Sequence, residues 1–119
     1  MPLRIYLAGP MRGIPEFNFL AFHTAAKELR SYGHVVFNPA ERDEAEFGKF
    51  SCPTGAESEF AAHTGLTPME ARRNCFLADT TWICREAEAI ALLPGWQNSK
   101  GARAELALSE ALGLEVIYL

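Results

Sequence analysis

The sequence predicts a single α/β domain over residues 1–119, built on a doubly wound, Rossmann-like or flavodoxin-like parallel sheet of four or five strands with flanking helices. Three observations support this fold class. Short, almost wholly apolar runs are typical of strands buried on both faces. These runs alternate with segments of helical periodicity, and Gly or Pro punctuates the boundaries. The length suits one domain.

The first part of the chain predicts a strand–helix–strand unit. Leu3–Ala8 is an apolar run ended by Gly-Pro, which indicates a central strand. Apolar residues then recur at helical spacing from Phe19 to Leu29, and Gly33 provides a stop. The second strand is His34–Phe37, closed by Asn-Pro. We expect a right-handed crossover between the two strands.

The second part continues the alternation after a less regular segment. Residues 40–65 have weak periodicity and many charges, so we expect an irregular excursion with short helical turns that is a candidate lid. Thr67-Pro68-Met69-Glu70 is a capping box with Pro at the first helical position, opening a helix to about Arg85. The remaining elements are a strand over 87–93, a helix over 99–112 that stops at Gly113, and a closing strand over 114–119.

Composition narrows the class of protein. The net charge is −4 and no basic run occurs, which disfavours nucleic acid as a partner. The three cysteines show no CxxC spacing and the three histidines no metal-ligand spacing, so reduced thiols and the absence of a metal are expected. No run has signal-peptide or membrane-spanning character, which predicts a cytoplasmic protein away from membranes. Local cations could still bind one anion: Arg12, Arg72, Arg73, Lys100 and Arg103.

The segment Trp96–Leu106 is the most informative for function. A loop carrying Ser99 runs into a helix through Gly101, and the free N–H groups of a helix N-terminus favour an anion such as phosphate. Glu105 follows among alanines and leucines, so an inward-facing Glu105 would be either paired or catalytic. The alternative is a glutamate near the helix start that faces water and is favoured by the helix dipole.

The turn Gly9-Pro10-Met11-Arg12-Gly13 follows the first strand and belongs on the same sheet edge as the Ser99 loop. It lacks the GxGxxG and GxxxxGK[ST] spacings, which argues against dinucleotide redox chemistry and triphosphate hydrolysis. Its N–H groups and Arg12 could hold one anion. On this segment alone, an ordinary tight turn is the favoured interpretation.

Two further residues could join a site at this edge. Asp79 lies in the capping-box helix, on one face with three other residues: Arg72, Cys75 and Trp82. Phe76 and Ile83 are the better core candidates, so a solvent-exposed Asp79 is the favoured interpretation when it is taken alone. Tyr6 is either a core aromatic or a hydroxyl that reaches a carboxylate. Two carboxylates beside an anion site could cleave a glycosidic bond, one attacking the anomeric carbon and one protonating the leaving group.

In this order and spacing, the motifs resemble the nucleoside 2-deoxyribosyltransferase superfamily over nearly the whole chain, residues 40–65 least. The closest subset is the 2′-deoxynucleoside 5′-monophosphate N-glycosidases, together with small uncharacterised phage and bacterial relatives. The resemblance implies hydrolysis of a (deoxy)nucleoside 5′-monophosphate to free base and (deoxy)ribose 5-phosphate. It also implies no cofactor, and a homodimer or larger homo-oligomer.

The resemblance assigns roles to particular residues. In Tyr6-x-x-Gly9-x-x-Arg12-Gly13, the Tyr orients the catalytic carboxylate and the whole turn from Gly9 to Gly13 contacts the 5′-phosphate. In Asp79-x-x-Trp82, the Asp contacts the sugar and assists departure of the base. In Ser99-x-Gly101-x-x-x-Glu105, the Ser binds phosphate and the Glu attacks C1′ to form a covalent intermediate. Either tryptophan, Trp82 or Trp96, would stack on the base.

Three departures from the family pattern bear on the reaction. Pro10 stands where the hydrolases have a hydroxyl residue, which removes a donor. Arg103 replaces a usual Gly, and it either adds a phosphate contact or crowds the site. The sequence given stops at Leu119 without the extension that completes a neighbour's base pocket in the transferases, which favours hydrolysis over base exchange. The alternatives are a deoxyribosyltransferase and a non-catalytic nucleotide-binding or sensor module.

Overall fold

The computed structural model describes residues 2–119 and contains one parallel sheet. Its strands are β1 (Arg4–Ala8), β2 (Val35–Phe37), β3 (Ala89–Leu92) and β4 (Glu115–Tyr118), in the order β2-β1-β3-β4. The predicted α/β Rossmann-like class is confirmed, with four strands. β1 occupies a central position and is paired on both sides, which agrees with its apolar sequence.

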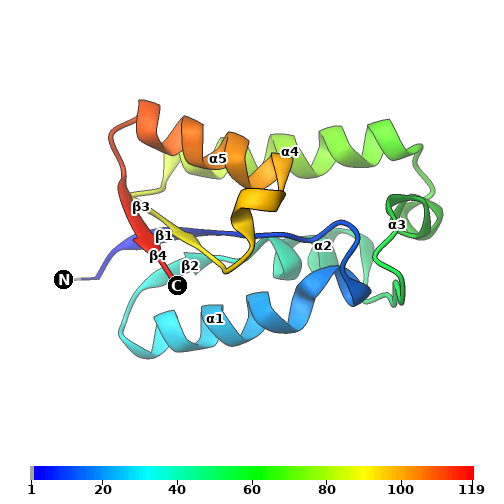
Figure 1. Cartoon of the computed structure of the whole chain (residues 1–119), viewed down its shortest axis with the longest axis horizontal. Coiled ribbons are helices and arrows are strands. Elements are labelled where there is room, and N and C mark those ends of the chain that lie inside the picture. The colour runs from blue at the N-terminus through cyan, green and yellow to red at the C-terminus, as the bar shows by residue number, and fades with distance from the viewer. Residues whose placement is uncertain (1) are drawn as a thin grey trace.

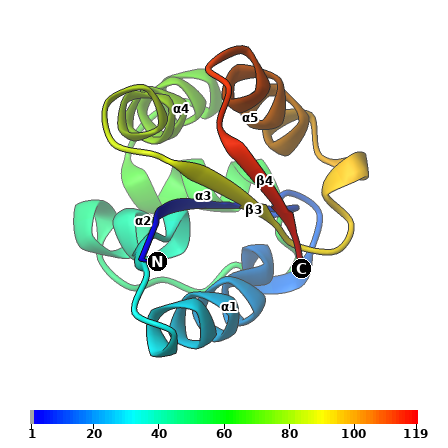
Figure 2. The ribbon, with the colours of Figure 1, turned by 90° about the vertical axis from the view of Figure 1, so that its left-hand side faces the viewer.

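Helices cover both faces of this sheet (Figures 1 and 2). α1 (Phe19–Ser31) lies on one face, and α4 (Pro68–Arg85) and α5 (Lys100–Ala111) lie on the other. α2 (Pro39–Phe47) and α3 (Glu57–Thr64) lie toward the carboxyl ends of the strands. Two short turns complete the chain, η1 (Pro15–Asn18) and η2 (Trp96–Asn98). No helix in this part of the chain is both long and apolar enough to cross a membrane.

The core has one layer on each face of the sheet, because alternate side chains of a strand point to opposite faces. Ile5 and Leu7 of β1 pack in the layer that contains α1 residues such as Phe22. Tyr6 and Ala8 point the other way and pack with residues of α4 and α5. A third cluster lies outside the sheet and joins four residues: Phe17, Cys52, Phe60 and Ala71.

The segment 40–65 is more regular than the sequence analysis expects. Most of it forms α2 and α3 instead of an irregular excursion. α2 begins at Pro39 because the side chain of Asn38 accepts the N–H of Ala40 at 2.9 Å, and Pro is well suited to a first helical position. Asn38-Pro39 is therefore a helix start as well as a strand end. The helices are held by the outlying cluster of Phe17, Cys52, Phe60 and Ala71.

The helix starts predicted from local motifs are confirmed. Thr67 Oγ1 accepts the Glu70 N–H at 3.1 Å, and the Glu70 carboxylate accepts the Thr67 N–H at 2.9 Å. The predicted faces of α4 are partly wrong. Ile83 is buried in the core, but Phe76 is 38% exposed and Asp79 is buried. The reason is that only the last part of α4 packs on the sheet, and Cys75, Phe76 and Asp79 line a cavity.

Candidate functional site

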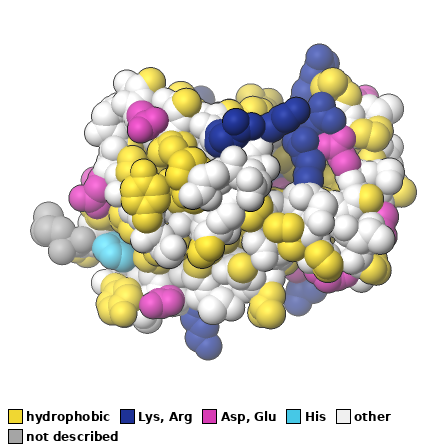
Figure 3. Space-filling view, viewed as in Figure 1, with side chains coloured by type: hydrophobic (Ala, Val, Ile, Leu, Met, Phe, Trp, Pro, Cys, Tyr) yellow, Lys and Arg dark blue, Asp and Glu magenta, His cyan; other side chains and the backbone are white. Residues whose placement is uncertain are grey.

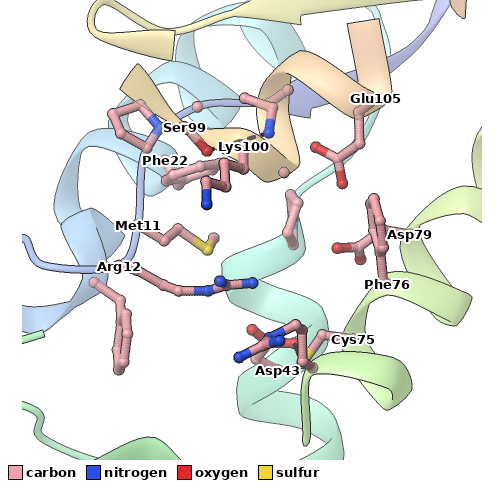
Figure 4. A pocket seen from close by; sticks show the side chains of 18 of the residues that line it. Met11, Arg12, Phe22, Asp43, Cys75, Phe76, Asp79, Ser99, Lys100 and Glu105 are labelled. Atoms are coloured by element: carbon pink, nitrogen blue, oxygen red, sulfur yellow. Dashed lines mark hydrogen bonds between the residues drawn. The ribbon is translucent and has the colours of Figure 1, made fainter. Parts of the chain in front are cut away.

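A cavity of about 650 Å³ lies beyond the carboxyl ends of β1 and β3 (Figure 4). Its size falls within the range of about 300–1,000 Å³ that is usual for small-molecule sites. The turn after β1, the helices α2 and α3, the first half of α4 and the start of α5 all contribute lining residues. Gly9 permits this arrangement, since a Cβ on it would lie 2.7 Å from the Cβ of Leu93 at the end of β3.

Tyr6 and Glu105 form the buried centre of the cavity wall. The Tyr6 hydroxyl donates to Oε2 of Glu105 at 2.8 Å, and the two side chains are 1% and 7% exposed. The Tyr6 ring stacks on Phe37 of β2, with centroids 5.5 Å apart, which holds the hydroxyl in place. Oε1 of Glu105 has no hydrogen-bond donor among the described residues, so one carboxyl oxygen is oriented and the other is free.

Asp79 lies beside this pair and is 9% exposed. Its Oδ1 is buried without a hydrogen-bond partner in the described chain. Burial, reinforced by the charge of Asp43, raises the pKa of Asp79 to about 7. Burial and the charge of Asp79 raise the pKa of Glu105 to about 8, against the opposing effect of the Tyr6 hydroxyl. Glu105 and Asp79 therefore titrate as a coupled pair that holds about one proton between pH 7 and 8.

The start of α5 presents anion-binding groups to the same cavity. Ser99 caps the helix by accepting the Ala102 N–H at 3.1 Å, which leaves its hydroxyl hydrogen available to donate. The N–H groups of Lys100 and Gly101 have no acceptor among the described residues. Ser99, Lys100 and Gly101 all line the cavity, and Figure 4 shows Ser99 and Lys100 near Met11 of the β1 turn. Together these groups form a small cationic end of the cavity.

The turn after β1 contributes to this end only in part. Gly9, Pro10, Met11 and Arg12 line the cavity. Met11 and Arg12 have N–H groups without a described acceptor, whereas Pro10 has none to offer. Gly13 does not line the cavity, because its N–H donates to the Gly55 carbonyl at 2.8 Å. The phosphate-binding role predicted for Gly13 is therefore not supported by its position.

An unusual backbone conformation holds this turn. Glu16, Phe17 and Asn18 have positive φ values of 56°, 52° and 61°. Such values are uncommon outside glycine and cost free energy, so they persist only where surrounding contacts impose them. The contacts are present: the Asn18 side chain donates to the Pro10 carbonyl at 3.1 Å, and the Glu16 N–H donates to the Cys52 carbonyl at 2.8 Å. The loop containing Cys52 thus fixes the wall to which Phe17 belongs.

Two acidic residues that the sequence analysis does not single out also line the cavity. Glu57 of α3 bridges Arg12 and Arg72, with N–O distances of 3.1 and 2.6 Å. Asp43 of α2 is 6% exposed, and burial raises its pKa to about 6 despite Arg42 at 3.3 Å. The only local signal for Asp43 is its i, i+3 spacing from the buried Ala40 in a helix that begins at Asn38-Pro39.

Three further residues predicted for the site, besides Gly13, lie elsewhere. Trp82 and Trp96 do not line the cavity, because their rings pack on Phe37 and Tyr118, with centroids 5.2 and 6.1 Å apart. Arg103 is exposed and is also outside the lining, so it neither crowds the cavity nor reaches it. The aromatic ring on α4 that does line the cavity near Asp79 is Phe76.

Charge is distributed unevenly over this part of the molecule. Figure 3 shows Lys and Arg side chains gathered around a hollow, with acidic side chains between them. Within the cavity, the carboxylates Glu105, Asp79 and Asp43 follow one wall, and Lys100 and Arg12 lie opposite (Figure 4). Over residues 2–119, no group of three or more His, Cys, Asp or Glu side chains has an arrangement that could hold a metal ion.

Comparison with known proteins identifies a family without an assigned activity. Residues 3–118 match the family model described as "Domain of unknown function (DUF4406)". No curated protein matches the sequence.

Proposed function

We propose that this chain, which belongs to the DUF4406 family, hydrolyses the N-glycosidic bond of a (deoxy)nucleoside 5′-monophosphate. The products are the free base and (deoxy)ribose 5-phosphate. The observation that carries the proposal is the buried Glu105, held by Tyr6, beside the unpartnered Asp79 and within the same cavity as the free N–H groups of α5. The resemblance of the motifs to the 2′-deoxynucleoside 5′-monophosphate N-glycosidases supports the same reaction.

The first step requires one ionised carboxyl group and one protonated group. The free Oε1 of Glu105 attacks C1′ of the sugar, and a C1′–O bond forms as the C1′–N bond breaks. The electron pair of the broken bond goes to the base, which takes the proton held by Asp79. The pair holds about one proton between pH 7 and 8, and Glu105 has the higher pKa, about 8 against about 7 for Asp79. The reactive form, with Glu105 ionised and Asp79 protonated, is therefore the less populated of the two forms that share this proton, and the reaction proceeds from it.

The second step releases the sugar from the protein. Water attacks C1′ while the Asp79 carboxylate takes one of its protons, and the C1′–O bond to Glu105 breaks. Glu105 leaves as a carboxylate, so the pair again holds one proton. Tyr6 is a positioning residue in both steps, because its hydrogen bond to Oε2 fixes which oxygen faces the sugar.

The cationic end of the cavity supports a 5′-monophosphate as the substrate, because it offers groups that could bind the phosphate. Ser99 can donate its hydroxyl hydrogen, Lys100 and Gly101 can donate N–H groups, and Lys100 and Arg12 supply positive charge. A 5′-phosphate anchored there would bring C1′ toward Glu105. Assembly as a homodimer, expected by the same resemblance, remains a prediction.

The test is chromatography of released base after incubation with deoxy- and ribonucleoside monophosphates and with the free nucleosides. Glu105→Gln keeps the side-chain shape and removes the nucleophile. Glu110→Gln, at an exposed position of the same helix, is the matched control. Release by the wild type and by Glu110→Gln, but not by Glu105→Gln, would support the proposal.

Two other outcomes would contradict it. Equal release by Glu105→Gln would remove the nucleophile assignment. Calorimetric binding of nucleotides with no release from any of them would favour the non-catalytic binding module. Addition of a free acceptor base separates hydrolysis from transfer, since a deoxyribosyltransferase would form a new nucleotide.

A further inference from the structure

The cavity contains a third buried carboxyl group that the proposed reaction does not use. Asp43 lies near the start of α2, and its side chain points into the cavity from the wall opposite the start of α5 (Figure 4). Its Oδ1 receives a hydrogen bond from Arg42 at 3.3 Å and one from the Cys75 thiol at 3.6 Å. Its Oδ2 has no donor among residues 2–119.

Asp43 lines the cavity, and its Oδ2, unlike Oδ1 of Asp79, is not sealed from solvent. A ligand that covers this oxygen must offer it an N–H or O–H group, because a buried acceptor left without a donor is costly. Because Oδ1 already accepts two hydrogen bonds, Oδ2 is the oxygen of Asp43 that is left to bind a ligand. Oδ2 would accept a hydrogen bond from one donor group of that ligand.

The position of Asp43 relative to Glu105 indicates which part of a bound nucleotide would lie near Asp43. In Figure 4 Glu105, Asp79 and Asp43 follow one another along the wall, with Asp79 in the middle. The electrostatic coupling has the same order, since Asp79 acts on Glu105, and Asp43 acts on Asp79. If C1′ lies at Glu105 and the glycosidic nitrogen lies near Asp79, the edge of the base farthest from the sugar lies toward Asp43.

We infer that Asp43 selects the base, accepting a hydrogen bond from an exocyclic amino group at Oδ2 and so favouring cytosine and adenine nucleotides over uracil and hypoxanthine nucleotides. This inference rests on the proposed function for the placement of the sugar. A carboxylate accepts hydrogen bonds from amino groups, as it does from the N4 amino group of cytosine in the major groove.

Uracil and hypoxanthine present a carbonyl oxygen at the corresponding position. That oxygen would face the Asp43 oxygen as one acceptor against another. The neighbouring thiol does not relieve this conflict, because the Cys75 S–H is directed to Oδ1. Sites built around one satisfied polar contact discriminate strongly against the analogue that lacks it.

The experiment compares two pairs of nucleotides that differ at this position, dCMP with dUMP and dAMP with dIMP. For the wild type we expect kcat/KM to favour the amino member by about tenfold or more in at least one pair, the factor that a charge-assisted hydrogen bond typically supplies. Asp43→Asn can present either an oxygen or an NH₂ group to the base. It should reduce the preference to within about threefold. Glu46→Gln, at an exposed position of α2, should leave it unchanged.

A second arm measures binding, so that the result does not depend on turnover. In a Glu105→Gln background, the dissociation constants of the four nucleotides are measured by calorimetry with and without Asp43→Asn. Thermal unfolding checks that each variant folds, and Asp43→Ser replaces any Asn variant that does not.

The outcomes separate this inference from the proposed function. Absence of base release with an amino preference in binding that depends on Asp43 would overturn the proposed reaction and support the role of Asp43. Base release without an amino preference, or with a preference that Asp43→Asn retains, would overturn the role of Asp43 alone. Failure to bind any of the four nucleotides would overturn both.

Discussion

The hydroxyl of Tyr6 donates a 2.8 Å hydrogen bond to Oε2 of Glu105, joining the first strand to the last helix inside the core. Tyr6→Phe removes this bond and keeps the ring that stacks on Phe37. Under the proposed reaction, kcat should fall about 10- to 100-fold, as is typical when an orienting partner is lost. Base release under saturating nucleotide measures kcat.

A purely structural role for Tyr6 would change stability or KM and leave the pH profile in place. The orienting role predicts more. The Tyr6 hydroxyl lowers the pKa values of both Glu105 and Asp79, so its removal should move both limbs of the kcat profile to higher pH. A profile whose limbs stay in place would argue against the orienting role.

The pH dependence of the wild-type reaction should be bell-shaped. Activity needs one ionised and one protonated carboxyl group, and the pKa values of about 7 for Asp79 and about 8 for Glu105 place the maximum between them. Asp79→Asn removes the acid and also the charge that raises the Glu105 pKa. Its rate should be about 10²- to 10⁴-fold lower, and the alkaline limb should disappear, because no acid is left to lose its proton as the pH rises. A profile that is flat from pH 5 to 9 would contradict this assignment.

The buried carboxyl group of Glu105 should make the protein less stable at alkaline pH. The pKa of Glu105 is about 8 in the folded protein and 4.5 in its ordinary state, so the folded chain binds more protons between these values. The contribution to stability is complete below pH 4.5 and is lost as the pH rises through 8. Glu105→Gln cannot ionise. At pH 9 it should be more stable than the wild type by on the order of a few kcal/mol, and at pH 4 it should differ little.

Denaturant unfolding at the two pH values measures this difference. Glu110→Gln is again the matched control, because an exposed carboxyl group should leave the pH dependence of the wild type unchanged. A Glu105→Gln variant that loses stability equally at both pH values would show that folding does not raise the pKa of Glu105.

Ser99→Ala tests the anion site and separates it from the helix cap. Loss of the cap should cost about 1 kcal/mol of folding free energy. If the hydroxyl also donates to phosphate, KM should rise for the 5′-monophosphate and change little for the free nucleoside. A parallel change for both substrates would indicate a cap alone. Ser99→Thr keeps the hydroxyl and should restore both properties.

Gly55→Ala should disrupt the wall that carries the β1 turn. A Cβ at Gly55 would collide with the Ile14 backbone, and φ is 69°. Gly65 lies in the left-handed helical region with a φ of 75° and has open space around it, so Gly65→Ala measures the conformational cost alone. We expect about 1 kcal/mol of destabilisation for Gly65→Ala and about 3 kcal/mol or more for Gly55→Ala, from thermal or denaturant unfolding. Equal effects would show that the backbone can move away.

The parts of this structure that depend on local chemistry could be predicted from the sequence. The apolar runs predict the strands, Ser99 and Thr67 predict two helix starts, and the alternation of elements predicts the sheet. The carboxyl edge of that sheet brings the Ser99 loop and the Met11 turn into one cavity, as the fold class requires.

The positions that could not be predicted from the sequence depend on contacts between distant segments of the chain. The tryptophans Trp82 and Trp96 find ring partners on β2 and β4, which no local pattern reveals. Asp79 looks exposed when its helix is considered alone, and only the overhang of α4 beyond the sheet explains its burial. Asp43 is buried because α2 packs beside α4, as its contact with Cys75 shows.

The three left-handed residues Glu16, Phe17 and Asn18 also bear on the order of folding. Each would relax to a commoner conformation in a short peptide, and the loop that restrains them, residues 51–55, is synthesised well after them. The entropy of closing that loop must be overcome before the turn after β1 takes its final shape. We therefore expect the sheet strands β1 and β2 to pair early and the cavity wall to form late. A nucleotide bound at that wall would therefore stabilise the part of the protein that folds last.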